Sequence, residues 1–178
     1  SVVVVIVILP FRHAVTFMNI SVCFGSNASL TDKLILEEKM IEQVIERWFE
    51  IVQGKEEMDD LLDEDCVFWS PILFHPQIGR KLTKMYLSAA SVVFPGDKDK
   101  VKESSGSFRY TKRVMDGNHA VLEFETVIDG ISVNGVDIIT CNDEGKIIEF
   151  KVMLRPQKAV EKAREQMMGA LTHLNLDS

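Results

Sequence analysis

The sequence predicts an α+β fold in which helices precede an antiparallel sheet. Up to residue 93 the apolar residues recur mainly at helical spacing, and from residue 108 the period changes to two. Turn residues divide the second part into four segments, and a last helical pattern follows Pro156. Helices, then a run of adjacent strands, are typical of the α+β class.

Length and composition predict one domain with terminal extensions. A chain of 178 residues can bury roughly two-thirds of its unfolded surface in one core. We expect the domain at residues 31–174, and a leader or non-core extension at residues 1–30.

The first residues allow two interpretations. Val2–Leu9 is an apolar run of eight residues that ends at Pro10, too short for a membrane span, which needs about 20 residues. Met18 is either the true start, with upstream sequence before it, or the run is the remnant of a signal peptide with a cleavage zone at Ser26–Ala28. We expect no membrane partner.

Charge argues against a nucleic-acid partner. The net charge is −7, and residues 31–65 hold thirteen acidic side chains against four basic ones. The basic candidates at residues 98–102 and 155–164 are short and interleaved with acids, whereas binding to a phosphate backbone requires a continuous basic stripe.

The cysteines and histidines predict neither disulfides nor a metal site. Neither type shows paired or metal-ligand spacing. A reducing compartment, the cytoplasm, fits this usage best. The residues concerned are Cys23, Cys66, Cys141, His13, His75, His119 and His173.

The first half contains three predicted helices and one strand. Over residues 31–52 an amphipathic stripe contains Ile41, Val44, Ile45, Trp48 and Val52, with Thr31 as the expected cap and Gly54 after the helix. A short second helix is expected around Met58, Leu61 and Leu62, followed by a strand at 66–69. The third helix, 80–93, has the inward stripe Leu82, Met85, Tyr86 and Ala89 and stops at 95–97.

The second half predicts an antiparallel meander of strands at 108–115, 120–129, 131–141 and 147–154. In the strand at 120–129, alternation assigns Leu122, Phe124, Thr126 and Ile128 to the apolar face. In the strand at 147–154, it likewise assigns Ile148, Phe150, Val152 and Leu154 to the apolar face. After Pro156 the last helix packs through Val160, Ala163, Met167 and Leu171, with a frayed end from residue 174.

Asp137 is the most informative residue because it interrupts an otherwise apolar strand. A carboxylate out of water finds a charge partner, accepts strong hydrogen bonds, or stays protonated with a raised pKa. Its neighbours of both parities are apolar, so the pattern does not decide which face is dry. Asp137 therefore either lies on a wet face or serves as an acid in a pocket.

Several segments together resemble the nuclear-transport-factor-2-like superfamily. The first helix with Leu61–Val67 resembles its opening, and Asp137–Ile147 resembles its penultimate hairpin. Ser70-Pro71, Gly79-Arg80 and Val152–Pro156 resemble the SnoaL-like, polyketide-cyclase-like branch. The likeness covers about residues 31–160. It implies a cone-shaped barrel of a strongly curved antiparallel sheet, wrapped by N-terminal helices and followed by a C-terminal helix.

The resemblance also implies a role for Asp137. Ketosteroid isomerases of this superfamily carry an oxyanion-stabilising aspartic acid at the matching place, whereas their general base would fall at Ser70, before Pro71. The implied function is a small-molecule-binding protein, with a cofactor-independent isomerase, cyclase or hydratase acting on an apolar carbonyl compound as the leading interpretation. The alternative is a non-catalytic ligand-binding or dimerisation module.

Six further residues are candidates for the site. His75 in a loop after the first strand would shuttle protons near neutral pH, or is simply exposed. Trp69 and Tyr86 offer flat walls to an aromatic or cyclic ligand, or pack in the core. Tyr110 is placed to donate to a ligand oxygen or lies on the rim, and Phe124 and Phe150 belong to the predicted inner face.

Cross-strand charges at Glu123, Glu125, Glu149 and Lys151 suit solvent or a homodimer interface, and we expect a homodimer.

Overall fold

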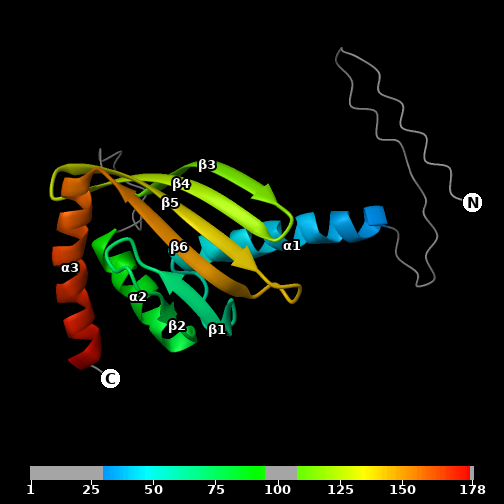
Figure 1. Ribbon diagram of the computed structural model, residues 1–178, viewed down its shortest axis with the longest axis horizontal. Coiled ribbons are helices and arrows are strands. Elements are labelled where there is room, and N and C mark those ends of the chain that lie inside the picture. Colours follow the sequence, from blue (N-terminus) through cyan, green and yellow to red (C-terminus); the bar gives the residue numbers. More distant parts are fainter. Residues whose placement is uncertain (1–29, 95–107, 177–178) are drawn as a thin grey trace, which may run out of the picture.

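The computed structural model describes residues 30–94 and 108–176 as three helices and a six-stranded sheet (Figure 1). Residues 1–29 of the expected leader, the predicted turn at 95–97 and the basic run at 98–102 lie outside the described residues. In chain order the elements are α1 (Leu30–Val52), β1 (Leu62–Trp69), β2 (Gln77–Ile78), α2 (Arg80–Val93), β3 (Arg109–Asp116), β4 (His119–Ile128), β5 (Ile131–Cys141), β6 (Ile147–Arg155) and α3 (Gln157–Leu176).

The sheet confirms the α+β class and the predicted meander, but it is mixed and open. Its strand order is β2-β1-β6-β5-β4-β3, so β2 and β3 are its edges. Strands β3 to β6 pair antiparallel in sequence order. Strand β1 pairs parallel with β6, which corrects the expected all-antiparallel sheet. A parallel pair needs a long connection, and α2 with the first strands of the meander supplies it.

Turn chemistry fixes the meander locally. The β4–β5 hairpin turns through Asp129 and Gly130, both with positive φ (47° and 78°). Two positive φ values are what a two-residue type I′ turn requires, and Asp-Gly is a preferred pair there. The observed β5 has the predicted bounds.

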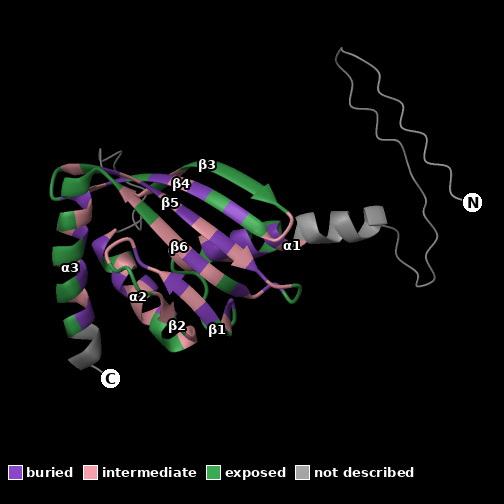
Figure 2. Ribbon diagram, in the orientation of Figure 1, coloured by how far each residue is buried: buried purple, intermediate pink, exposed green. Residues whose placement is uncertain are grey.

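Alternation in β4 and β5 separates two faces, which we call inner and outer. The inner face carries Ala120, Leu122 and Phe124, all buried, and the outer face carries Val121 and Glu125. Figure 2 shows the same alternation of buried and exposed residues along the strands. The helices pack on the inner face: α1 joins it in one apolar cluster and α3 in a second.

Helix α1 packs as predicted, and on α2 the predicted inward residues Met85, Tyr86 and Ala89 also pack against the core. Ile41, Val44, Ile45 and Trp48 are buried. On α2 the expected inward residue Leu82 is 40% exposed, and the buried residues are Thr83, Leu87, Ala89 and Val93. Leu87 belongs to the cluster with α1, and Ala89 to the cluster with α3. A helix that packs between two neighbours does not show one single apolar stripe.

Two other local predictions are wrong. The segment around Met58 and Leu61 forms turns rather than a short helix, because Leu61 is drawn into sheet pairing: its carbonyl accepts a 2.8 Å hydrogen bond from the Ile147 amide. Ile148, expected inward, is 37% exposed, and Ile147 is buried instead. An irregularity in register between Thr140 and Cys141 shifts this end of β6.

Candidate active site

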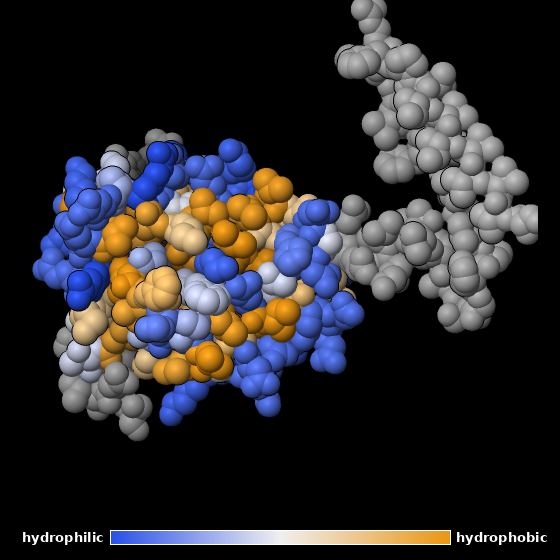
Figure 3. Space-filling model, viewed as in Figure 1, coloured by the Kyte–Doolittle hydropathy of each residue, from blue (hydrophilic) through white to orange (hydrophobic). Residues whose placement is uncertain are grey.

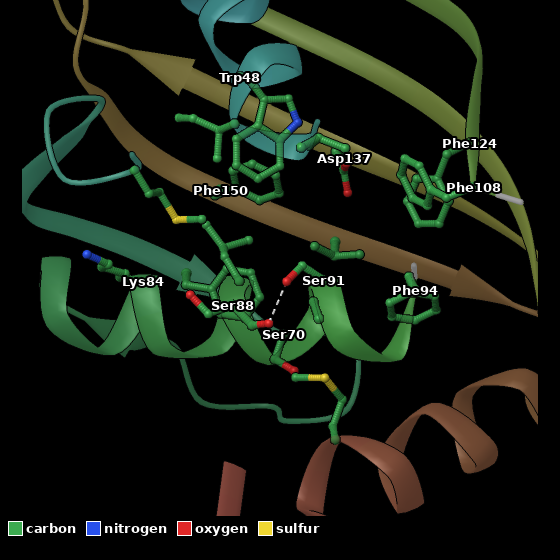
Figure 4. Close-up of a pocket in the computed structure, with 18 of the residues that line it drawn as sticks. Trp48, Ser70, Lys84, Ser88, Ser91, Phe94, Phe108, Phe124, Asp137 and Phe150 are labelled. Atoms are coloured by element: carbon green, nitrogen blue, oxygen red, sulfur yellow. Dashed lines mark hydrogen bonds between the residues drawn. The ribbon is translucent and has the colours of Figure 1, made fainter. Parts of the chain in front are cut away.

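A cavity of about 290 Å³ lies between the inner face of the sheet and helices α1 and α2 (Figure 4). Its walls are mainly aromatic and aliphatic. They include Trp48, Phe68, Phe94, Phe108, Phe124, Phe150 and Val152. Such an apolar cavity with a few polar groups is the usual form of a small-molecule site.

Asp137 is on the dry face of β5 and on the wall of this cavity. It shares the inner face with Val133 and Ile139, and its residue is 5% exposed. The sequence pattern left both faces open because Val136 and Ile138 are apolar too. In the structure these two residues are half-buried on the outer face.

A chain of hydrogen bonds holds the Asp137 side chain. The Tyr110 hydroxyl on β3 donates to Asp137 Oδ2 at 2.7 Å. The Trp48 indole N–H on α1 donates to the Tyr110 oxygen at 2.9 Å. Because Trp48 already donates to that oxygen, the Tyr110 proton is directed to the carboxyl. Tyr110 was predicted as a site residue, whereas Trp48 was predicted as part of the apolar stripe of the first helix.

Burial raises the pKa of Asp137 to about 7, although the hydrogen bond from Tyr110 acts in the opposite direction. The pKa of Tyr110 is raised well above its usual value, first by burial and then by the nearby Asp137 charge. Near neutral pH the carboxyl is therefore present in both protonation states. Such a group can donate a proton or a hydrogen bond to a ligand and can also accept a proton.

Aromatic rings form a continuous wall beside this carboxyl. Phe108 stacks on Phe124 with centroids 4.8 Å apart, and Phe94 meets Phe124 edge-on at 6.4 Å. Phe124 lies directly over Gly135, where an added Cβ would come within 2.2 Å of the ring carbon Cζ. Gly135 precedes Asp137 by two positions on the same face, so the absence of its side chain lets the ring lie next to the acid.

The structure brings together four of the seven predicted site residues: Asp137, Tyr110, Phe124 and Phe150 all line the cavity. His75 is exposed in the loop between β1 and β2 and its ring contacts Phe74. Trp69 lies under the Lys151 ammonium, which is 5.1 Å from its ring centroid. Tyr86 packs against Phe68. These last three do not line the cavity.

Hydroxyl groups on the cavity wall were missed by the sequence reasoning. Ser70 follows β1, and Ser88 and Ser91 lie one turn apart on α2. Figure 4 shows Lys84, Ser88 and Ser91 along the helix that borders the cavity. Their spacing of four and three residues was the available signal, but small polar residues in a helix more often face solvent.

Two searches of the described residues gave negative results. Residues 30–94 and 108–176 contain no group of three or more His, Cys, Asp or Glu that could hold a metal ion. In the same residues no helix is long and apolar enough to cross a membrane.

The cysteines that the structure describes, Cys66 and Cys141, are buried and free. Burial is the largest cause that raises the pKa of each thiol. Cys23 lies outside the described residues.

The fold was compared with known proteins and solved structures. No protein-family model matches the chain, and no curated protein matches it significantly. Among solved structures, a steroid delta-isomerase from Pseudomonas aeruginosa is 26% identical, with a TM-score of 0.68 and coverage of 78% of this chain and 96% of that one.

Two further structures are similar. An uncharacterised bacterial protein with a cystatin-like fold from Silicibacter pomeroyi is 31% identical (TM-score 0.60; 71% and 83% covered). An NTF2-like protein of unknown function from Mesorhizobium loti is 18% identical (TM-score 0.54; 67% and 94% covered) and shares the fold. The order of helices and strands, the open mixed sheet with its cavity, and these likenesses lead to one assignment. The chain has the nuclear-transport-factor-2-like fold.

Proposed function

We propose that the cavity binds a small apolar carbonyl compound and that Asp137 acts on its carbonyl oxygen. The observation that carries this proposal is the buried Asp137 carboxyl, held by Tyr110 on a mainly apolar cavity wall. A protonated carboxyl there is a hydrogen-bond donor in a medium of low dielectric, where such a bond is strong. The likeness to a steroid delta-isomerase supports the same chemistry.

Cavity size limits the ligand. An engineered protein cavity of about 150 Å³ binds benzene, and the cavity here is about 290 Å³. A compound of about two fused rings therefore fits within the cavity. Its rings would contact the wall formed by Phe108, Phe124 and Phe150.

The proposed reaction is proton transfer α to the carbonyl, without a cofactor. The α C–H bond breaks, its proton passes to a base, and the electron pair moves through carbon to the carbonyl oxygen. Asp137 stabilises the resulting enolate by donating its hydrogen bond or its proton to that oxygen. Return of a proton at a different carbon completes an isomerisation. In a cyclisation the enolate carbon instead attacks a second carbonyl, and the resulting alkoxide takes up the proton from the base. In a hydration, water adds to the conjugated ketone, with its OH at the β carbon and a proton at the α carbon.

The alternative function is a ligand-binding module without catalysis, and one observation favours it. Among the described residues that line the cavity, Asp137 is the one buried acid, and there is no histidine. The other two acids of this lining, Glu56 and Glu57, are exposed on the segment after α1. Glu56 already pairs with Arg47. A binder needs one anchor, whereas proton transfer needs a second group or a water in reach of the ligand.

Exchange of the α-hydrogens of 2-tetralone in D₂O, followed by NMR, separates these functions. We expect the protein to accelerate exchange and Asp137→Asn to lose about 10²-fold of that rate. The amide keeps the size of the side chain, so the affinity for 2-tetralone reports whether the site is intact. Asp116→Asn, on the exposed end of β3, is the control.

Three results decide the outcome. Equal exchange rates and equal affinities for Asp137→Asn and the unchanged protein would remove Asp137 from the mechanism. Binding of 2-tetralone without accelerated exchange would favour the non-catalytic module. No binding of 2-tetralone would contradict the carbonyl-binding proposal.

We also propose that two copies associate through the outer face. This face presents exposed Val114, Val121 and Met153 between charged residues. In Figure 1 helix α1 passes behind the strands, and Figure 3, in the same view, shows hydrophobic groups interspersed with hydrophilic ones. Ion pairs such as Arg109–Glu125 and Lys151–Glu149 lie on this sheet. A face that carried charges of one sign only would repel a second copy. A face with charges of both signs can pair with the same face of a second copy.

Sedimentation velocity tests the association. We expect a dimer, and a monomer for Met153→Asp, which places a charge within the apolar part of the surface. A monomer for the unchanged protein at high micromolar concentration would contradict the homodimer.

A further inference from the structure

The cavity has a second polar region, formed by the end of β1 and one side of α2. Ser70, Ser88 and Ser91 line the same cavity as Asp137. In Figure 4 they lie across the cavity from Trp48 and Asp137. Strand β6, which carries Phe150 and Val152 of the lining, lies between β1, which Ser70 follows, and β5, which carries Asp137.

Ser70 is the donor of this region. Its residue is only 8% exposed, and its Oγ accepts a long, 3.3 Å hydrogen bond from the Ile72 amide. Among the described residues, no hydrogen bond is found in which the Ser70 hydroxyl donates. A buried hydroxyl without an acceptor is unfavourable, and a ligand oxygen would satisfy it.

Ser91 differs from Ser70 because its proton is already used. Its hydroxyl donates to the Ser88 carbonyl at 2.7 Å, a bond within one turn of α2. Its Oγ lone pairs remain able to accept. The region therefore combines a donor at Ser70 with acceptor capacity at Ser91, which suits a hydroxyl group best and a carbonyl group second.

Charge excludes an anionic group at this position. Among the described residues that line the cavity, Lys84 is the one with a cationic side chain. Its ammonium already forms an ion pair and a hydrogen bond with Asp59. A carboxylate or phosphate in the apolar cavity would need an unpaired cation. The second functional group of the ligand is thus neutral.

We propose that the ligand is a difunctional compound that is bound at both ends, with its carbonyl oxygen at Asp137 and a neutral hydroxyl or carbonyl oxygen at Ser70. This inference rests on the proposed carbonyl binding at Asp137. Two polar contacts separated by an apolar wall fix both the position and the direction of a ligand. Ser70 is a binding residue that sets specificity and takes no part in proton transfer.

Paired ligands test the proposal. The dissociation constants of 2-tetralone and 6-hydroxy- and 7-hydroxy-2-tetralone are measured for the unchanged protein, Ser70→Ala and Ser70→Thr by isothermal titration calorimetry. We expect at least one hydroxyl isomer to bind about five- to tenfold more tightly than 2-tetralone. This gain should vanish in Ser70→Ala and persist in Ser70→Thr, which keeps the hydroxyl.

The unsubstituted ketone keeps the two proposals separable. Unchanged affinity of Ser70→Ala for 2-tetralone shows an intact site, and Ser132→Ala, exposed on β5, controls for loss of a serine. If 2-tetralone binds but neither hydroxyl isomer gains affinity, or if Ser70→Ala keeps the gain, the second anchor is wrong and the proposed function stands. If none of the three ketones binds, both proposals are wrong.

Discussion

The Tyr110 hydroxyl and the Asp137 carboxyl are 2.7 Å apart, and their hydrogen bond joins β3 to β5 across the intervening β4. The bond lies beneath the aromatic wall, since the Tyr110 ring meets Phe108 edge-on at 5.1 Å. It orients the carboxyl on the wall of the cavity. The proposed chemistry depends on this pair.

Removal of the Tyr110 hydroxyl should raise the pKa of Asp137 above 7, because the bond that favours the ionised form is lost. Tyr110→Phe also leaves the buried Trp48 N–H without its acceptor. We expect a loss of about 1–3 kcal/mol in the free energy of unfolding, measured with urea at pH 6. An unchanged stability and an unchanged Asp137 pKa would show that the chain of hydrogen bonds does not hold the carboxyl.

The contribution of Asp137 to the free energy of unfolding should decrease as the pH rises from 4 to 7. The folded-state pKa of Asp137, about 7, lies above the usual 3.8, so in this window the folded protein holds a proton that the unfolded chain has lost. Below pH 4 the raised pKa of Asp137 does not lower the free energy of unfolding. Above pH 7 it lowers the free energy of unfolding by about 4 kcal/mol.

Asp137→Asn isolates this contribution. Its stability relative to the unchanged protein should grow with pH across the window, and urea unfolding at pH 4, 6 and 8 measures the difference. The control is Asp116→Asn, whose side chain is exposed. A constant difference between Asp137→Asn and the unchanged protein at all three pH values would mean that Asp137 has an ordinary pKa.

Affinity for a ketone should also depend on the protonation of Asp137. The protonated carboxyl donates to the carbonyl oxygen, whereas the ionised one repels it. Below pH 7 the dissociation constant of 2-tetralone should be constant, and above pH 7 it should rise about tenfold per pH unit. Titration calorimetry from pH 5.5 to 8.5 measures this, and Asp137→Asn should remove the dependence. Tighter binding at high pH would exclude the acid as the donor.

Gly135 should be required for the shape of the cavity. An alanine Cβ would overlap the Phe124 ring, so Gly135→Ala should push this ring into the cavity, weaken 2-tetralone binding and cost about 1–3 kcal/mol of stability. The smaller side chain in Gly135→Ala/Phe124→Leu should restore part of the stability.

Gly169→Ala is the matched control for this substitution. Gly169 is exposed on α3, and nothing lies within 4 Å of an added Cβ, so alanine should stabilise the helix slightly. Equal effects of the substitutions at Gly135 and Gly169 would show that the overlap with Phe124 is not significant.

Local patterns predicted those parts of the fold that local forces determine. The stripe of α1 and the alternation of β4 follow directly from residue spacing, and the Asp129-Gly130 turn fixes its hairpin. The parallel pairing of β1 with β6 and the inward rotation of Ile147 depend on strand register between distant segments. No spacing within one segment carries that information.

The site was predictable to the same extent. Asp137 was singled out because a charge in an apolar strand is unusual, and Phe124 and Phe150 followed from alternation. Trp69 was misplaced relative to the cavity because Cys66–Trp69 is apolar at every position, so the sequence did not show that Phe68 faces inward and Trp69 outward. Ser88 and Ser91 were missed because only the packing of α2 reveals which of its sides meets the cavity.

The carbon NMR titration of the Asp137 carboxyl, assigned by comparison with Asp137→Asn, tests the central claim most directly. A dry carboxyl beside Tyr110 predicts a midpoint near pH 7, and Tyr110→Phe should move the midpoint upward. A midpoint near pH 4, the value of a solvated aspartate, would contradict the account.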